Sequence, residues 1–360
     1  MRQVGAVMAQ IALAAGLGIA FLVWVCGVPV DSIVGGGGQR VQARTPEYDV
    51  MCPGWGAGSV IHHVSDAGRA VGTGREPDGR RLAIAWHDGT TVHCSHRGWR
   101  EDAVASDGRG RVALNLGRLG LDWRRAAVGL PGEEPVPLAV PAPECSSRVC
   151  DMNRAGTAVG VVVRPGEAGR ACVWDASGAL TMLDDAPGCA VSISNASVVA
   201  GFITEASGRD IVRLWLPEAG GWRSVDLIRD LNASARPDAV SDHGVVVGTI
   251  GLCIPFRWDR ETGLHTLPVP GGLSGTATDV NVRGEVVGRC ASDEGSTALL
   301  WRGREVIDLN TRISAMEGAR LCEATAINDA GMIACVALRH DRREAVLLIP
   351  RDPMREAARP

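Results

Sequence analysis

The sequence predicts an all-β fold built from a repeated unit, and three observations support this prediction. Of its 360 residues, 46 are Gly and 19 are Pro, and the aromatic residues are ten Trp, three Phe and one Tyr. This composition favours many short strands joined by tight turns. An eight-residue pattern recurs along the chain, and a Trp follows most copies at a similar distance. Because 46% of the residues are hydrophobic and 22% are charged, the chain can bury a core.

The repeated pattern has the form Ser/Asn-Asp-x-Gly-x-x-Val-Gly. Its clearest copies are residues 65–72 and 241–248, and residues 153–160 and 281–288 follow the same plan. The last position falls at 72, 114, 160, 201, 248, 288 and 335, with a mean spacing of about 44 residues, which is typical of repeat architectures. The Trp residues that follow by 10 to 14 positions are Trp86, Trp174, Trp215, Trp258 and Trp301.

Each unit is expected to contain four short strands. In the sixth unit these strands are predicted at 276–280, 285–289, 298–301 and 305–309. Asn, Asp or Ser at the first corner can bond the following backbone, and the corner Gly can adopt positive φ. Small residues in the first strand suit a crowded central axis, and Trp in the third strand can fill the space between neighbouring sheets.

Seven such units predict a seven-bladed β-propeller of four-stranded blades, since closing the ring leaves only short edges. The seventh unit, residues 324–349, contains three strands, whereas residues 47–52 form a strand with no unit before it. We therefore expect the N-terminal strand to complete the last blade. An open superhelical stack is the alternative, and this complementary split disfavours it.

The repeats resemble those of the HAF family of extracellular repeat proteins. The segments that carry the resemblance are 64–68, 279–281, 300–309 and 326–331. It covers about residues 47–349 and implies an exported bacterial propeller that opens with a Tyr-containing strand, as Tyr48 does here. The family's His-Ala-Phe before Leu-Trp is missing, and the second and seventh units lack the Trp. The resemblance implies no catalytic residue.

The N-terminus is expected to direct the chain out of the cytoplasm. Residues 4–30 are almost wholly apolar and follow Arg2, so they predict a hydrophobic helix long enough to span a membrane. We assign residues 1–31 to a signal peptide or membrane anchor, 32–46 to a Gly-rich linker, 47–350 to the propeller and 351–360 to a charged tail. The predicted location is extracytoplasmic, either anchored in the membrane or secreted.

Ligand binding is predicted on the face that carries the longer connections, here called the long-loop face. It holds the connections between second and third strands and between a fourth strand and the next unit, and binding residues concentrate on such loops. Charged residues of both signs lie there, Arg81, Asp102 and Asp238 among them. Ordinary solvated charges or packing are the alternative for each residue. The residues selected as ligand contacts are Trp99, Arg100, Arg236 and Arg320.

No metal or cofactor is expected. The turn carboxylates Asp66, Asp242 and Asp329 are too sparse for a calcium loop, and turn capping explains them better. A zinc site is disfavoured for the His and Cys residues near position 94, because neighbours on a strand point to opposite sides. The chain contains no Lys, which excludes a P-loop and Schiff-base chemistry. The His and Cys residues in question are His62, His63, His93, Cys94 and His96.

The cysteines outside the N-terminal segment number ten. In an exported protein they are candidates for disulfides, and their pairing cannot be deduced from the sequence. Cys322 and Cys335 lie on adjacent predicted strands, and Cys145 is close in sequence to Cys150. Free buried thiols that pack as small hydrophobic groups are the alternative.

These observations favour an exported, non-enzymatic binding or scaffold propeller that presents its long-loop face to a protein or glycan at the cell envelope. It is expected to be a monomer and to contact the membrane through its N-terminal segment. The net charge of −4 gives no reason to expect nucleic-acid binding. The alternative is a propeller hydrolase or lyase with carboxylates and His at the channel mouth, because fold alone does not decide function.

Overall fold

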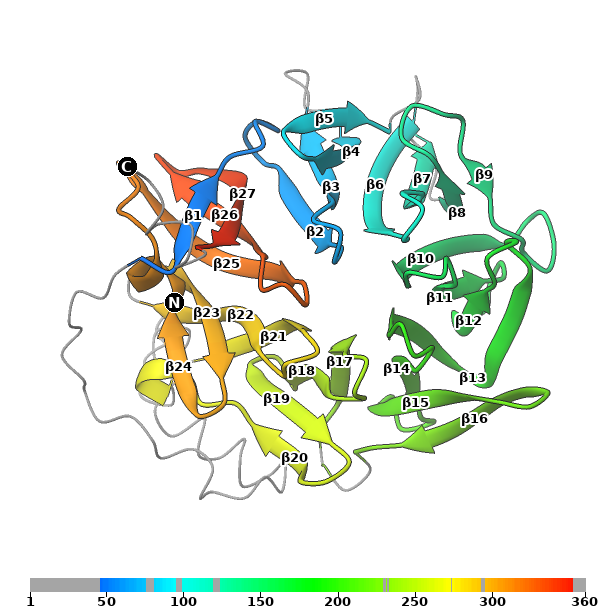
Figure 1. Cartoon of the computed structure of the whole chain (residues 1–360). Helices are drawn as coiled ribbons and strands as arrows, with labels where there is room; N and C mark the ends of the chain where they lie inside the picture. Colours follow the sequence, from blue (N-terminus) through cyan, green and yellow to red (C-terminus); the bar gives the residue numbers. More distant parts are fainter. Residues whose placement is uncertain are drawn as a thin grey trace, which may run out of the picture.

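The computed structural model describes residues 46–75, 81–94, 99–118, 124–228, 231, 233–272, 274–292 and 295–351. These residues form an all-β β-propeller whose sheets stand around a central channel (Figure 1). The helical elements among them are two short 3-10 helices, η2 (Pro270–Gly272) and η3 (Leu309–Arg312). No helix in this part of the chain is long and apolar enough to span a membrane. The predicted N-terminal helix lies outside the described residues.

The described strands form six antiparallel sheets. One four-stranded sheet comprises β2 (Val60–Val64), β3 (Ala70–Arg75), β4 (Arg81–His87) and β5 (Thr90–His93). A second comprises β6 (Trp99–Ser106), β7 (Val112–Arg118), β8 (Arg124–Gly129) and β9 (Val136–Pro137). A third comprises β17 (Ala235–Val240), β18 (Val246–Ile250), β19 (Ile254–Asp259) and β20 (Gly263–Thr266). The fourth comprises β21 (Gly275–Val280), β22 (Val286–Ser292), β23 (Gly295–Arg302) and β24 (Glu305–Asp308). The fifth comprises β25 (Ala319–Ile327), β26 (Ile333–Arg339), β27 (Arg342–Pro350) and β1 (Tyr48–Met51). The remaining sheet comprises β10 (Ser146–Met152), β11 (Ala158–Val163), β12 (Arg170–Trp174), β13 (Leu180–Ile193), β14 (Val199–Thr204), β15 (Asp210–Glu218) and β16 (Gly221–Asp226).

The prediction of seven four-stranded blades is wrong, because five sheets have four strands and one has seven. The cause is β13, which is 14 residues long and pairs with β12 near its start and with β14 near its end. Where the pattern predicts a break between two units, residues 184–187 stay extended and only interrupt the register with β12. One strand therefore belongs to two successive repeat units and joins their sheets.

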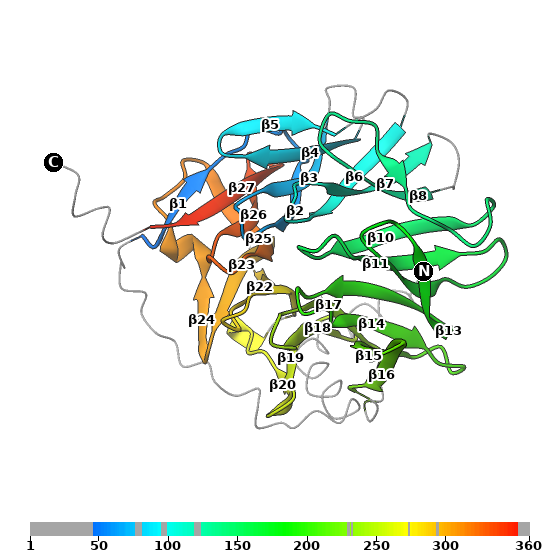
Figure 2. The same cartoon turned by 45° about the vertical axis from the view of Figure 1, so that its right-hand side comes forward.

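The ring is closed by the N-terminal strand, as the incomplete seventh unit indicates. β1 pairs with β27 from Tyr48 opposite Pro350 to Met51 opposite Leu347, and Figure 2 shows the blue and red strands side by side. Ion pairs reinforce this closure: Glu47 bonds Arg312 at 2.6 Å and Arg302 at 3.2 Å. These contacts join residues from opposite ends of the described chain.

The innermost strand of each unit carries a β-bulge at the same place. In β10, Val149 pairs with Gly160 and Asp151 pairs with Val159, so Cys150 is left without a partner. A Cβ at Gly160 would overlap the carbonyl oxygen of Arg148. Gly at this position therefore permits the close approach of the two strands in this unit, whereas Leu114 and Cys335 occupy the same position in the second and seventh units. The strands that share this bulge are β2, β6, β10, β13, β17, β21 and β25.

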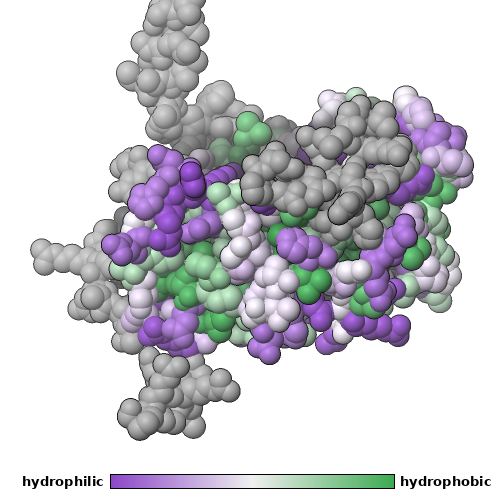
Figure 3. Space-filling model, turned by 90° about the horizontal axis from the view of Figure 1, so that it is seen from above, coloured by the Kyte–Doolittle hydropathy of each residue, from purple (hydrophilic) through white to green (hydrophobic). Residues whose placement is uncertain are grey.

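The Trp residues of the repeat fill the space between units, as predicted. Trp174, Trp215 and Trp301 are fully buried. Trp174 packs with Ala105 and Ala113 of the preceding sheet, and its indole N–H donates to the Ala139 carbonyl at 2.7 Å. On the side of the ring shown in Figure 3, polar and apolar residues alternate over the coloured surface.

Candidate functional site

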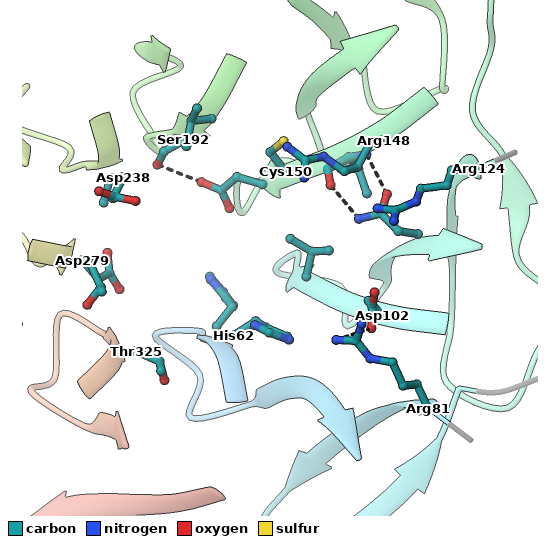
Figure 4. Close-up of a pocket in the computed structure, with 18 residues that line it drawn as sticks. His62, Arg81, Asp102, Arg124, Arg148, Cys150, Ser192, Asp238, Asp279 and Thr325 are labelled. Carbon is teal, nitrogen blue, oxygen red and sulfur yellow. Dashed lines mark hydrogen bonds and ion pairs between the residues drawn. The ribbon is translucent and has the colours of Figure 1, made fainter. Parts of the chain in front are cut away.

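The bulges turn a ring of side chains toward the central channel. A bulge leaves one residue unpaired and can direct its side chain away from the sheet. The seven bulge residues all line one cavity of about 410 Å³ (Figure 4). They are His62, Val104, Cys150, Val191, Asp238, Thr278 and Thr325. The repeat thus supplies a fixed frame, and the sequence places five kinds of side chain on it: two Val, two Thr, one His, one Cys and one Asp.

Arginine side chains line one side of this cavity. Arg81 and Arg124 are the first residues of β4 and β8, directly after connections on the long-loop face, and Arg148 lies on β10. Arg81 pairs with Asp102 at 3.2 Å. Among the described residues, neither Arg124 nor Arg148 has a carboxylate within ion-pair distance. The charges of Arg124 and Arg148 are therefore not neutralised by a carboxylate of the described residues.

Carboxylates line the opposite side, where Figure 4 shows Asp238 and Asp279 facing Arg124 and Arg148 across the cavity. Loss of hydration between the channel walls raises the pKa of Asp238 to about 7, and Arg236 opposes this rise. The Asp238 side chain nevertheless remains open to the water of the channel. Asp238 can therefore change its charge near neutral pH, and so can Asp279, whose pKa is also raised to about 7.

Asp279 also holds two inner strands together. Its carboxylate accepts the backbone N–H of Val280 and that of Ile327, each at 2.8 Å. Burial raises its pKa to about 7, and the negative charges of Asp151 and Asp329 add to the rise, whereas the two N–H groups oppose it. Asp151 makes the equivalent bridge from β10 to β13, accepting from Met152 at 2.7 Å and from Ile193 at 2.9 Å.

His62 is part of a three-residue hydrogen-bonded chain. The Thr73 hydroxyl donates to Asp102 Oδ1 at 3.1 Å, and the Thr73 hydroxyl oxygen lies 3.1 Å from His62 Nε2. Because the carboxylate only accepts, the Thr73 oxygen must accept from His62, which places the ring proton on Nε2. Burial lowers the pKa of His62, so the neutral ring keeps an unprotonated Nδ1.

The opposite mouth of the channel is formed by the tight turns of the repeat. Asp242 Oδ1 accepts a hydrogen bond from the backbone N–H of Asn195 at 2.5 Å, and Asp329 Oδ1 accepts one from the backbone N–H of Val282 at 2.8 Å. The backbone N–H of Asp329 in turn donates to Asp66 Oδ1 at 3.1 Å. The prediction that these carboxylates cap their own turns is wrong, since they bridge neighbouring units. The residue before the carboxylate caps the turn instead: Ser241 Oγ, for example, accepts a hydrogen bond from the backbone N–H of Val245.

Of the four residues predicted as ligand contacts, two have side chains within the described part of the structure. Trp99 and Arg100 begin β6, and their side chains lie outside the described part of the structure. Arg236 bonds Asp210 at 2.6 Å and stacks 4.3 Å from the centre of the Phe202 ring. Arg320 donates to the Ser296 carbonyl at 2.5 Å. Neither Arg236 nor Arg320 lines the cavity.

The spacing of the repeat marks the residues that line the cavity. Each bulge residue stands ten positions before the last residue of its repeat, as His62 stands before Gly72 and Asp238 before Gly248. Arg81, Asp102 and Asp238 were noted only as loop charges. Arg124 and Arg148 lie outside the repeated pattern and give no such signal.

The ten described cysteines are free thiols. Neither pair considered from the sequence is bonded, and the Cys150 sulfur lies 3.6 Å from that of Cys189. Within the described residues, no three His, Cys, Asp or Glu side chains are grouped so that they could hold a metal ion. His96, a member of the cluster considered for zinc, lies outside this part of the chain.

No protein-family model matches the sequence, and no curated protein is similar to it. The HAF assignment is therefore not confirmed. Solved β-propellers are similar in structure: YCF48 bound to D1 peptide has 11% identity and a TM-score of 0.53, over 88% of this chain and 100% of that one. A puromycin-hydrolyzing peptidase of Mycobacterium tuberculosis has 13% identity and a TM-score of 0.55, over 83% of this chain and 52% of that one. The β-propeller domain of the Trilobed protease from Pyrococcus furiosus has 10% identity and a TM-score of 0.53, over 80% of this chain and 95% of that one. These similarities establish the β-propeller fold.

Proposed function

We propose that this chain is an exported, non-enzymatic binding propeller that holds a peptide segment of a partner protein in the channel mouth on its long-loop face. The observation that carries the proposal is the separation of charge in the cavity. Arg124 and Arg148 have no carboxylate partner among the described residues, and they face Asp238 and Asp279. A peptide offers carboxylates to one side and amino or N–H groups to the other.

A similar structure supports this choice of ligand, since the propeller YCF48 is recorded with a bound peptide. The residues selected from the sequence enter the proposal as outer contacts of the same ligand, beyond the cavity. Residues 1–31 are proposed to export or anchor the chain, which places this mouth outside the cytoplasm. The outer contacts are Trp99, Arg100, Arg236 and Arg320.

The test is a binding screen with peptides that end in a free carboxylate or carry Asp and Glu, followed by titration of the best ligand. Replacing both Arg124 and Arg148 by Ala should weaken binding by about 10- to 100-fold for each charge-assisted hydrogen bond lost. The control is Arg304→Ala, an exposed arginine in the turn between β23 and β24. Equal affinities for wild type and the double variant would contradict this site. Binding to glycans but not peptides would contradict the ligand class.

A hydrolase or lyase is the second candidate, because the chain from His62 through Thr73 to Asp102 leaves a neutral imidazole nitrogen available as a general base. This candidate predicts turnover in a screen of glycosides, lactones and esters. Thr73→Val would remove the hydroxyl that links His62 to Asp102 and should lower the rate of any such activity. Absence of turnover across the screen would count against this candidate.

A further inference from the structure

A pair of cysteines lies in the channel wall beside the arginine side of the cavity. Cys150 is the bulge residue of β10 and lines the cavity, whereas Cys189 is buried on β13, the neighbouring inner strand. Their sulfur atoms are 3.6 Å apart. A disulfide bond is about 2.0 Å long, so small side-chain movements would join the two sulfurs and link the inner strands of two successive units.

Arg148 connects this pair to the cavity. It lies two residues before Cys150 on β10, and its positive charge acts on both cysteines. The two cysteines are in hydrogen-bond contact, which raises the pKa of Cys150 and lowers that of Cys189, and Arg148 also favours the Cys189 thiolate. Thiolates are the reactive form in disulfide exchange. The form of the pair with one proton, from which disulfide exchange starts, is therefore favoured by a neighbouring positive charge.

We propose that Cys150 and Cys189 form a reversible disulfide, and that its formation releases the Arg148 guanidinium from the two sulfurs into the cavity. A disulfide is neutral and a poor hydrogen-bond acceptor, so Arg148 loses the partner it has in the reduced protein. The oxidised protein then presents a stronger site for an anionic group. Only this last consequence rests on the proposed function, because it requires a ligand in the cavity.

The oxidant is a low-molecular-weight disulfide such as oxidised glutathione. Cys150, which faces the cavity, passes its proton to Cys189 and attacks the glutathione disulfide, and one glutathione thiolate leaves. That thiolate takes the proton from Cys189, whose sulfur then attacks Cys150 and displaces the second glutathione. The protein pair loses two electrons, and one glutathione disulfide becomes one thiol and one thiolate.

The first experiment detects the bond in the full chain. The protein is equilibrated with oxidised or reduced glutathione, its free thiols are alkylated, and its peptides are examined by mass spectrometry. We expect a Cys150–Cys189 cross-link after oxidation that dithiothreitol removes and that Cys150→Ser abolishes. Cys172→Ser, a change at a neighbouring buried thiol, should keep the cross-link. Complete alkylation of both Cys150 and Cys189 after oxidation of the folded protein would overturn the proposal.

The second experiment follows Arg148 without any ligand. Phenylglyoxal reacts with accessible guanidinium groups, and the rate at each arginine can be measured by mass spectrometry. Oxidation should raise the rate at Arg148 several-fold and leave Arg124, which lines the same cavity, unchanged. In Cys150→Ser the rate at Arg148 should not depend on oxidation. Equal rates at Arg148 in both states of the wild type would overturn its release, whereas failure of the peptide screen would overturn only the proposed function.

Discussion

The two mouths of the central channel are built on the same inner strands, yet their charges are compensated in different ways. At the tight-turn mouth, Asp66, Asp242 and Asp329 each accept a backbone N–H from a neighbouring unit. At the long-loop mouth, Arg124 and Arg148 have no carboxylate partner among the described residues. Charges at repeated positions therefore hold the ring together. The charges of Arg124 and Arg148, which the repeated pattern does not specify, are not compensated in this way.

The same division is visible within the inner strands. The residue that follows the bulge is Asp151 in β10 and Asp279 in β21, and both side chains bridge two strands through backbone N–H groups. The bulge residue itself varies from Val104 to Asp238 and faces the cavity. One position thus serves the scaffold, and its immediate neighbour determines the chemistry of the channel.

The largest effect is expected where the scaffold leaves no space. Gly160→Ala would place a Cβ against the Arg148 carbonyl oxygen on the bulged strand, and relieving this overlap requires movement of backbone. We expect a loss of about 3 kcal/mol in the free energy of unfolding, measured in urea. Gly221→Ala is the control, since no atom lies within 4 Å of the new Cβ. Similar stabilities for the two variants would show that the bulge does not constrain the repeat.

A smaller loss of stability is expected at the tight-turn mouth. Asp329→Ala leaves the Val282 N–H without its acceptor and removes one link between neighbouring units. The expected cost is about 1–2 kcal/mol in the free energy of unfolding. Asp185→Ala is the matched control, because the Asp185 side chain is fully exposed and lies 4.0 Å from Arg170. If both changes cost the same, the bridges between turns do not contribute to the ring.

The sequence was sufficient for the β-propeller and its closure because both follow from spacing. The count of separate blades failed at β13, where residues 184–187 continue one strand instead of ending it. The four ligand contacts stay a prediction, but Arg236 shows why a loop charge does not by itself locate the cavity. Arg236 was selected as a loop charge, but it bonds Asp210 and stacks on Phe202, and a repeat pattern does not show which strands supply such partners. The bulge position does follow from the repeat, so His62 and Asp238 could have been identified.

The acidic side of the cavity is expected to make stability depend on pH. The pKa of Asp238 is raised from 3.8 to about 7 in the folded chain, so folding favours its protonated form. Wild type should therefore lose stability as the pH rises from about 4 to about 7, as the unfolded chain releases this proton first. Asp238→Asn should remove this loss and be more stable than wild type at pH 8, with no difference at pH 4. Urea unfolding at the two pH values measures the difference, and an equal difference at both would contradict the assignment.

The smallest effect on stability is expected at the arginine side, and it separates the two mouths most clearly. Arg124 is exposed at the start of β8 and has no carboxylate partner in the described part of the chain. Arg124→Ala should therefore change the free energy of unfolding by no more than about 0.5 kcal/mol, while it weakens peptide binding. Arg312→Ala is the contrasting variant, because Arg312 is buried and pairs with Glu47 and Glu305, and it should lower stability instead. A loss of stability in Arg124→Ala equal to that in Arg312→Ala would mean that the long-loop mouth is also part of the scaffold.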